Sequence, residues 1–536
     1  MKPWANDNGV LTYGNYVQGE DVGSDKWVHV LSVRAMLEDS FQSLRLKRDL
    51  DRGTRDLATV EPGMVVGRVA VADEDVNRRA LEAAAAAAIE WRAFPIEARL
   101  DILDRVHAAV RQQRDELIRM LTLEGHPLEL AKWEYSGMLE ATGPAARDFL
   151  REQLWREYRT EDGRRRIVRR QPDGVVCVNP PANAPMSSAL LAALSMASGN
   201  AVVVRAPRTA PMGVMYAMRE LIAPLLDDAG VPPGTLNVVC GHPAPLLKMW
   251  LESPHVDDIM YFGNVESGLK FEQKCVAARK KPILELAGND SVLVWADADL
   301  DHAADAIVEG FFGSGQLCMI PNQVLAHPAI ADELIERMAT KARAMRPGYP
   351  DTEGVVLSPV LRHDGFHAFL DDAVTKGATL VTGGRGMHLD GTPGDTGFFL
   401  EPTVIRVDGL AKARELDAVR EETFFPLIPV VVADKGIENA KLLDGFIQYI
   451  NTNTYGLRNS LWAKDDAVID RYVTEVVNGG LLKINESHIA FAAPLPSHGG
   501  TGVTGGVFGE ANYPVLRTTH LQGVAISDGN RPPRYR

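Results

Sequence analysis

The sequence predicts an α/β protein in which helices pack against largely parallel sheets. Short apolar strands alternate with helical segments between residues 175 and 262, a rhythm typical of a parallel sheet covered by helices. A second run of the same kind begins near residue 291. The chain has 536 residues, of which 46% are hydrophobic, enough for two or three hydrophobic cores. We therefore expect more than one domain.

The first run has a clear element order. We expect strands at residues 175–178, 201–205, 236–240 and 258–262, and helices at residues 187–197 and 209–228. Thr209 is the expected cap of the second helix, and Gly230 its end. Short apolar strands in βαβαβ order are the usual frame for a dinucleotide. This run therefore predicts a Rossmann-like cofactor domain.

The rest of the chain is read in the same way. In the second run we expect a strand at residues 291–295, a helix at 300–312, a loop with Cys318, and further elements at 331–346, 366–376, 379–382 and 427–432. Before the first run, alanine-rich helices are expected from Asp73 to Trp91 and over residues 96–123. Residues 1–60 form an amino-terminal extension of open placement, with a strand near 13–20 and a helix from Ser32 to about residue 50. Residues 499–509 predict an ordered, turn-rich loop, and residues 528–536 a disordered tail.

Charge and composition exclude several classes of function. The formal net charge of -14 argues against binding to nucleic acid, and the basic run at residues 164–170 reads as a solvated face. The chain lacks an apolar stretch long enough for a membrane span and a recognisable secretory signal, so we expect a cytoplasmic protein. The four cysteines lack CxxC spacing and should be reduced thiols. The thirteen histidines show no metal spacing, so no metal site is expected.

Four segments carry the chemistry, and their order matters more than any one of them. They are residues 181–185 (PANAP), 284–288 (LELAG), 315–318 (GQLC) and 421–426 (EETFFP). In this order they resemble the aldehyde dehydrogenase superfamily, and the resemblance extends over residues 61–523. It implies an NAD(P)-binding domain (residues 61–150 and 172–287), a catalytic domain (residues 288–495) and a small β oligomerisation element (residues 151–171 and 510–527). Members are commonly homodimers or homotetramers.

The resemblance assigns the catalytic roles. An aldehyde gives up a hydride readily only after a nucleophile has added, and a cysteine thiolate is the best nucleophile near neutral pH. Cys318 is the expected nucleophile, as a thiolate stabilised by local dipoles. The Asn183 amide and the backbone N–H of Cys318 are the expected donors to the oxyanion, and Glu285 is the base that activates water. Each residue taken alone also has a purely structural interpretation. Cys318 would be a small buried hydrophobic residue, Asn183 a helix cap, and Glu285 an exposed residue at the end of a strand.

The resemblance also implies a cofactor site. Gly263, Asn264 and Gly268 open a helix after a strand, where backbone N–H groups can hold a pyrophosphate. Arg205 and Arg208 match the strand end that holds the adenosine ribose. NAD-preferring members often have glutamate at the position of Arg208, whereas an arginine neutralises a 2′-phosphate, so NADP is favoured over NAD. Glu422 and Phe424 resemble the pair that orients the nicotinamide ribose and ring.

Several departures from the family pattern leave alternatives open. Ala182 and Ala184 replace bulky aromatics, which suggests a wider tunnel and a bulky or long-chain aldehyde, unless the amino-terminal extension or the glycine-rich loop fills the space. Ala192 stands where a lysine is common, and Ala287 replaces a glycine. One alternative is a CoA-acylating aldehyde dehydrogenase, although such enzymes often lack the glutamate. Another is a catalytically silent binding or structural protein on the same scaffold.

Overall fold

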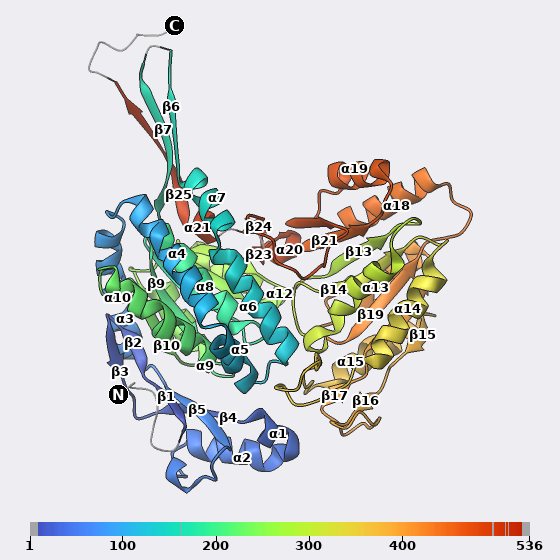
Figure 1. The fold of residues 1–536 in the computed structure, drawn as a ribbon, viewed down its shortest axis with the longest axis horizontal. Helices are drawn as coiled ribbons and strands as arrows, with labels where there is room; N and C mark the ends of the chain where they lie inside the picture. Colours follow the sequence, from blue (N-terminus) through green and yellow to red (C-terminus); the bar gives the residue numbers. More distant parts are fainter. Residues whose placement is uncertain (1–8, 162, 496–497, 510, 513, 528–536) are drawn as a thin grey trace.

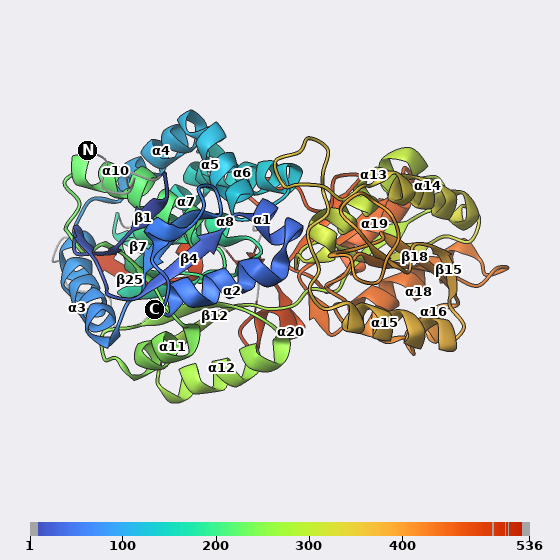
Figure 2. The same ribbon diagram turned by 90° about the horizontal axis from the view of Figure 1, so that it is seen from below.

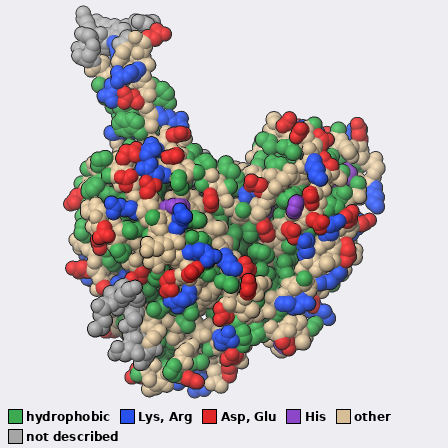
Figure 3. Space-filling view, viewed as in Figure 1, with side chains coloured by type: hydrophobic (Ala, Val, Ile, Leu, Met, Phe, Trp, Pro, Cys, Tyr) green, Lys and Arg blue, Asp and Glu red, His purple; other side chains and the backbone are tan. Residues whose placement is uncertain are grey.

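The computed structural model describes residues 9–161, 163–495, 498–509, 511–512 and 514–527. Two α/β lobes each surround a seven-stranded sheet, and a three-stranded sheet projects from the first lobe (Figure 1). The predicted α/β class is confirmed. The surface is indented between the two lobes (Figure 3).

The first lobe contains the predicted Rossmann-like run. The sheet has the order β12-β11-β8-β9-β10-β2-β3. Its parallel strands are β8 (Val175–Asn179), β9 (Ala201–Ala206), β10 (Leu236–Cys240), β11 (Asp258–Phe262) and β12 (Lys281–Glu285). Their carboxyl ends share one edge of the sheet, where ligands bind in this architecture. From the amino-terminal extension, β2 (Asn15–Val17) and β3 (Glu20–Val22) add two antiparallel strands.

Helices cover both faces of this sheet. Successive strand residues face opposite sides, so Val176 and Val178 enter one core while Val175 and Cys177 enter the other. The first core includes α4 (Ile96–Gln112), α5 (Arg114–Leu123), α6 (Leu128–Thr142), α7 (Pro144–Leu154), α8 (Pro185–Ala197), α9 (Met212–Met215), the π-helical stretch Tyr216–Ile222 and α10 (Ala223–Asp228). The second core includes α3 (Glu74–Trp91), α11 (Pro243–Glu252) and α12 (Val265–Ala277).

Side-chain caps explain two differences from the expected helices. The helix expected from Thr209 begins at Met212, because the carboxylate of Glu124 accepts from the N–H groups of Met212 and Gly213. The helix expected over residues 32–50 is divided into α1 (Val33–Glu38) and α2 (Ser40–Asp51). Asp39 ends α1, and its carboxylate caps α2 by accepting from the N–H of Gln42. The helix expected over residues 96–123 is also divided, at Gln113 between α4 and α5.

The second lobe contains the sheet β15-β18-β19-β14-β13-β21-β22. Its strands are β13 (Asp290–Val294), β14 (Pro321–Ala326), β15 (Thr379–Thr382), β18 (Thr403–Asp408), β19 (Leu427–Val432), β21 (Arg458–Trp462) and β22 (Leu481–Ile484). Its helices are α13 (Leu300–Val308), α14 (Ala331–Ala344), α15 (His363–Thr375), α16 (Leu410–Ala413), α17 (Asp417–Arg420), α18 (Asn439–Asn451) and α19 (Asp466–Glu475). The hairpin β16 (Gly386–Met387) and β17 (Phe399–Leu400) and the short β20 (Tyr455–Gly456) complete it.

The structure also contains two three-stranded sheets. The strands β1 (Leu11–Tyr13), β5 (Val65–Ala70) and β4 (Trp27–Leu31) form one, and α1 and α2 lie in the connection between β4 and β5. Viewed from below, α1 and α2 lie across the first lobe and reach toward the second (Figure 2). The projecting sheet consists of β6 (Trp155–Arg159), β7 (Arg165–Pro172) and β25 (Thr519–Ile526).

The glycine-rich region is ordered and contains β23 (His498–Gly499) and α20 (Gly502–Gly505), followed by β24 (Ala511–Asn512) and α21 (Pro514–Arg517). The tail expected to be disordered, residues 528–536, lies outside the described residues. Among the described residues, every helix is too short or too polar to cross a membrane.

Candidate active site

Close backbone contacts fix the loop that carries Cys318. Residues 313–315 all have left-handed φ, between 56° and 74°. A Cβ atom on Gly315 would lie 2.1 Å from the carbonyl oxygen of Phe425, and one on Gly288 would lie 2.1 Å from that of Cys318. Both positions therefore require glycine. These contacts bring the Cys318 loop against both the Glu285 segment and the Glu422 segment.

The three predicted catalytic residues, Asn183, Glu285 and Cys318, line one small cavity of about 20 Å³. The Cys318 Sγ lies 3.4 Å from Glu285 Oε1. The other carboxylate oxygen of Glu285 accepts from the N–H of Gly499 at 3.1 Å. The cavity has room for about one water molecule. A thiol, a carboxylate and an amide thus converge on one small space.

In this arrangement Cys318 is a thiol. Burial and the carboxylates of Glu285 and Glu422 raise the pKa of Cys318 well above its usual value. Burial and these carboxylates therefore disfavour the expected thiolate of Cys318 before a proton acceptor takes its proton. Burial also raises the pKa of Glu422 to about 8, although the N–H of Gly288 donates to its Oε1 at 3.0 Å. Activation of Cys318 requires transfer of its proton, and Glu285 is the acceptor in contact with it.

Asn183 follows β8 and is not a helix cap. The first N–H groups of α8, on Met186 and Ser187, donate to the carboxylate of Glu134, each at 2.8 Å. The Asn183 side-chain amide instead donates to the carbonyl oxygen of Gln316, in the Cys318 loop, at 3.0 Å. Asn183 also lines a second, much larger cavity. It therefore stands where the two cavities meet.

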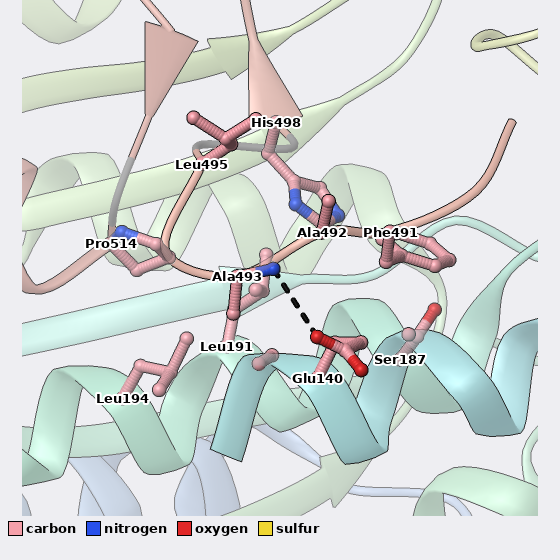
Figure 4. A pocket seen from close by; sticks show the side chains of 12 residues that line it. Glu140, Ser187, Leu191, Leu194, Phe491, Ala492, Ala493, Leu495, His498 and Pro514 are labelled. Carbon is pink, nitrogen blue, oxygen red and sulfur yellow. Dashed lines mark hydrogen bonds between the residues drawn. The ribbon is translucent and has the colours of Figure 1, made fainter. Parts of the chain in front are cut away.

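Phe491 lies at the Cys318 cavity that Ala184 also lines, whereas Ala182 lines the larger cavity. The Phe491 ring packs on Trp133, with ring centroids 5.2 Å apart. A Cβ on Gly137 would lie 2.5 Å from this ring, so α6 also contacts it closely. A further cavity of about 30 Å³, shown in Figure 4, shares Phe491, Ser187 and His498 with the first. The space beside Ala184 is therefore narrow, and the expected widening of the tunnel stays a prediction.

The larger cavity, of about 740 Å³, lies at the carboxyl ends of β8 and β9. Three parts of the chain form its walls: Asn183 and Arg208 after those strands, Gln316 and Phe424 from the second lobe, and residues 29–47 from the amino-terminal extension. Phe424 has a φ of 56°, which a bulky residue adopts only where the surrounding packing holds it. The Nε of Arg208 is buried and has no hydrogen-bond partner among the described residues.

The remaining predicted cofactor residues lie elsewhere on the same sheet edge, outside the linings of these cavities. Arg205 is buried, and its guanidinium donates to Asn179, Pro180 and Gly241 at the ends of β8 and β10. Asn264 caps α12 by accepting from the N–H of Ser267. A Cβ on Gly268 would lie 2.3 Å from the Leu286 side chain. Gly263 stands between β11 and this cap.

The sequence reading missed several residues around the site. His498 lines the Cys318 cavity, and burial lowers its pKa. His488 is fully buried beside Asp290 and Ser460. The sequence did contain one signal of a buried polar region, since Arg458 is a charged residue at the start of a buried strand. Across the described ranges, no group of three or more His, Cys, Asp or Glu residues is placed to hold a metal ion.

A dinucleotide-type sheet edge beside a cysteine, a buried carboxylate and an amide defines a class of oxidoreductase site. Residues 51–517 match the family model described as the aldehyde dehydrogenase family, and the chain belongs to this family. It is an NAD(P)-dependent aldehyde dehydrogenase by family, and the predicted resemblance is confirmed.

Individual relatives agree with this placement. The chain is 29% identical over 491 residues to glutarate-semialdehyde dehydrogenase of Pseudomonas aeruginosa, covering 89% of this chain and 96% of that protein. An aldehyde dehydrogenase of Mycobacterium tuberculosis complexed with NAD+ has a TM-score of 0.77 at 21% identity, covering 98% and 100% of the two chains. The glyceraldehyde-3-phosphate dehydrogenase of Methanocaldococcus jannaschii complexed with NADP has a TM-score of 0.73 at 24% identity, covering 87% and 97%. These two structures share the fold with this chain.

Proposed function

We propose that this protein oxidises an aldehyde to a carboxylic acid through a covalent adduct on Cys318. The observation that carries the proposal is the convergence of Cys318, Glu285 and Asn183 on one cavity, with sulfur and carboxylate 3.4 Å apart. A silent scaffold needs no such convergence, and a buried structural cysteine needs no carboxylate beside it.

The first half-reaction starts with the thiol proton. Glu285 accepts it, the electron pair stays on sulfur, and the thiolate adds to the aldehyde carbon. The negative charge that develops on the aldehyde oxygen needs donors, which the Asn183 amide supplies once it releases the carbonyl of Gln316, together with the backbone N–H of Cys318. The nicotinamide cofactor supplies the hydride acceptor, and loss of hydride leaves a thioester on Cys318.

The second half-reaction is hydrolysis of the thioester. Glu285, after losing its proton to solvent, is placed to take a proton from a water molecule beside Cys318, and the cavity has room for one. Addition of the resulting hydroxide to the thioester carbon and loss of the thiolate release the carboxylic acid. The presence of this carboxylate favours hydrolysis over transfer of the acyl group to CoA.

A Glu285→Gln variant tests the proposal. The introduced amide can neither accept the thiol proton nor activate water, so hydrolysis should slow by roughly 10²-fold or more. At alkaline pH, where solvent deprotonates the thiol, we expect one equivalent of reduced cofactor per site and an acyl group on Cys318, detected by mass spectrometry. Cys318→Ser is the matched control and should give neither. Undiminished turnover of the glutamine variant would refute the role of Glu285. If the wild-type enzyme formed acyl-CoA as fast as it forms the carboxylic acid, the CoA-acylating alternative would be favoured.

For the cofactor we propose NADP in preference to NAD. Arg208 supports this choice, because it lines the large cavity and its buried Nε lacks a partner among the described residues. Lys47 lines the same cavity, but its charge is paired with Asp51 at 3.2 Å. Glu422 and Phe424 are proposed to orient the nicotinamide ribose and ring, and the turn at Gly263, Asn264 and Gly268 to hold the pyrophosphate. Arg205 is proposed to hold in place the strand ends on which the adenosine ribose would rest, since its guanidinium is hydrogen-bonded to those strand ends.

The substrate proposed for this conformation is a small aldehyde. Cavities of about 20 and 30 Å³ on either side of Phe491 leave no room for a long chain unless this ring turns away. The bulky or long-chain aldehyde remains the alternative that such a movement would permit.

We also propose that the projecting sheet of β6, β7 and β25 joins subunits into a homodimer or homotetramer. Trp155, Tyr158 and Leu521 leave much of their surface exposed on it, which a partner subunit would cover.

A further inference from the structure

A buried ionic network lies next to the Cys318 loop. Asp290 begins β13 and Arg458 begins β21, and these neighbouring parallel strands place the two residues side by side. Arg458 and Asp290 are each 1% exposed and His488 is 0% exposed. Charged groups this deep in a protein persist only with partners, so the network is a costly feature that packing alone does not explain.

Hydrogen bonds fix the network in place. The Arg458 side chain donates to the carbonyl oxygen of His488 at 2.8 Å, and its backbone N–H to Asp290 at 3.3 Å. His488 contacts the other Asp290 oxygen at 3.3 Å and Ser460 at 2.6 Å. The guanidinium also lies 3.4 Å from the sulfur of Met319, the residue that follows Cys318. The position of the arginine is therefore tied to the catalytic loop.

The charges that face Cys318 come from three elements. Glu285 at the end of β12 and Glu422 after α17 are both acidic, and each disfavours a negative sulfur. Arg458 is the cation that opposes them, and the charges of Cys318 and Glu285 in turn favour the charged guanidinium. His498 on β23 lines the cavity but is neutral, because burial lowers its pKa. Lys483 on β22 donates to Ser487 and interacts with Arg458.

We propose that Arg458 is a positioning residue for the proposed reaction, whose buried positive charge favours the thiolate of Cys318 over the thiol. The step that it assists is the first one, in which the S–H bond breaks, the proton moves to Glu285 and the electron pair stays on sulfur. Once Glu285 carries this proton, the negative sulfur faces Glu422 and Arg458, and without the arginine the opposing positive charge would be lost. The carbonyl oxygen of His488 holds the guanidinium in place, and Asp290 holds the Arg458 backbone N–H. The inference rests on the proposed function, in which Cys318 is the nucleophile.

The test measures the pH dependence of Cys318 alkylation by iodoacetamide in the folded, cofactor-free enzyme. Cys177, Cys240 and Cys275 are fully buried, so alkylation reports on Cys318, and Cys318→Ser gives the background rate. In Arg458→Gln we expect the midpoint of the pH profile to rise. A rise of about one pH unit makes alkylation below the midpoint roughly tenfold slower. Arg458→Lys keeps the charge and should restore most of the wild-type profile.

A second variant keeps the test decisive if Arg458→Gln does not fold, since that change leaves Asp290 buried without its cation. Asp290→Asn combined with Arg458→Gln removes both charges, and its midpoint should shift in the same direction. A folded variant of either kind with an unchanged midpoint would overturn the inference, because a purely structural role does not move a titration. Alkylation requires no aldehyde or cofactor. Failure of the proposed oxidation would therefore be seen separately, as a normal Cys318 profile with no turnover.

Discussion

Two cavities meet at Asn183, and they differ most in size and access. The one beside Cys318 measures about 20 Å³ and is lined by Cys318, Glu285 and Asn183 together with apolar side chains such as Phe262 and Phe491. The other measures about 740 Å³, is lined largely by apolar side chains and reaches the exposed Leu44 and Leu361. Reaction chemistry needs a small, fixed space in which charges act strongly, whereas a dinucleotide needs room and an entrance. The contrast supports the proposal that the bond-making step takes place in the small cavity and that the cofactor binds in the large one.

Asn183 lines both cavities and therefore provides the strongest test of this division. Asn183→Ala removes the proposed side-chain donor to the oxyanion, so we expect kcat to fall by roughly 10²- to 10³-fold. Cofactor affinity should change little, because the large cavity keeps its remaining walls. Steady-state kinetics and a fluorescence titration with reduced cofactor measure the two effects. Asn183→Asp is the matched control: it keeps the shape, lacks the donor and should be at least as impaired. A large loss of cofactor affinity instead would place Asn183 in the cofactor site.

The large cavity can be tested through Arg208, whose Nε has no hydrogen-bond partner among the described residues. Arg208→Glu should reverse the ratio of kcat/KM for NADP to that for NAD by roughly 10- to 10²-fold, because a carboxylate repels a 2′-phosphate and can accept from ribose hydroxyls. The effect should appear in KM for the cofactor, while kcat at saturation stays close to wild type. Arg92→Glu, an exposed change of the same charge at the end of α3, is the control. An unchanged preference would show that Arg208 does not discriminate.

How much of this contrast the sequence could predict depends on which segments of the chain line each cavity. Cys318, Glu285 and Asn183 were predictable because each follows a recognisable strand or glycine turn, and parallel strands bring their carboxyl ends to one edge. Phe491 and His498 were not, since they lie in a segment without periodicity and reach the site only through long-range packing. Arg458 and Asp290 were missed for a similar reason, because the pairing of β13 with β21 joins residues 168 positions apart. The two alanines predicted open space; Phe491 lines the small cavity with Ala184, whereas Ala182 lines the large one.

Phe491 gives a third test, which concerns the small cavity. Phe491→Ala should join the cavities of about 20 and 30 Å³ and so admit a longer substrate. We expect the ratio of kcat/KM for a linear six-carbon aldehyde to that for acetaldehyde to rise roughly tenfold, the size expected for burying one or two more methylene groups. Phe508→Ala, which removes an exposed ring from the glycine-rich region, should leave the ratio unchanged. No change in Phe491→Ala would mean that the aldehyde enters by another route.

The smallest expected effect concerns the wall that lies outside the family match. The match begins at residue 51, so α1 and nearly all of α2 lie outside it, yet residues 29–47 line the large cavity. Helix α1 crosses to the second lobe. Leu37 packs in a cluster with Val356, Leu357, Met387 and Phe399, and Arg34 lies 3.7 Å from the centre of the Tyr349 ring. A helix held to both lobes over a cofactor cavity should slow cofactor release.

Leu37→Ala weakens that contact without altering any residue assigned to the chemistry. A partly buried leucine contributes about 1 kcal/mol, so dissociation of reduced cofactor should become roughly fivefold faster. Stopped-flow displacement with excess NADP measures this rate directly. Phe41→Ala is the matched control, because Phe41 lies on α2 with 76% of its surface exposed and outside the cavity lining. If both variants release cofactor at the wild-type rate, α1 is a passive wall, and the difference between the two cavities lies in their volume and lining alone.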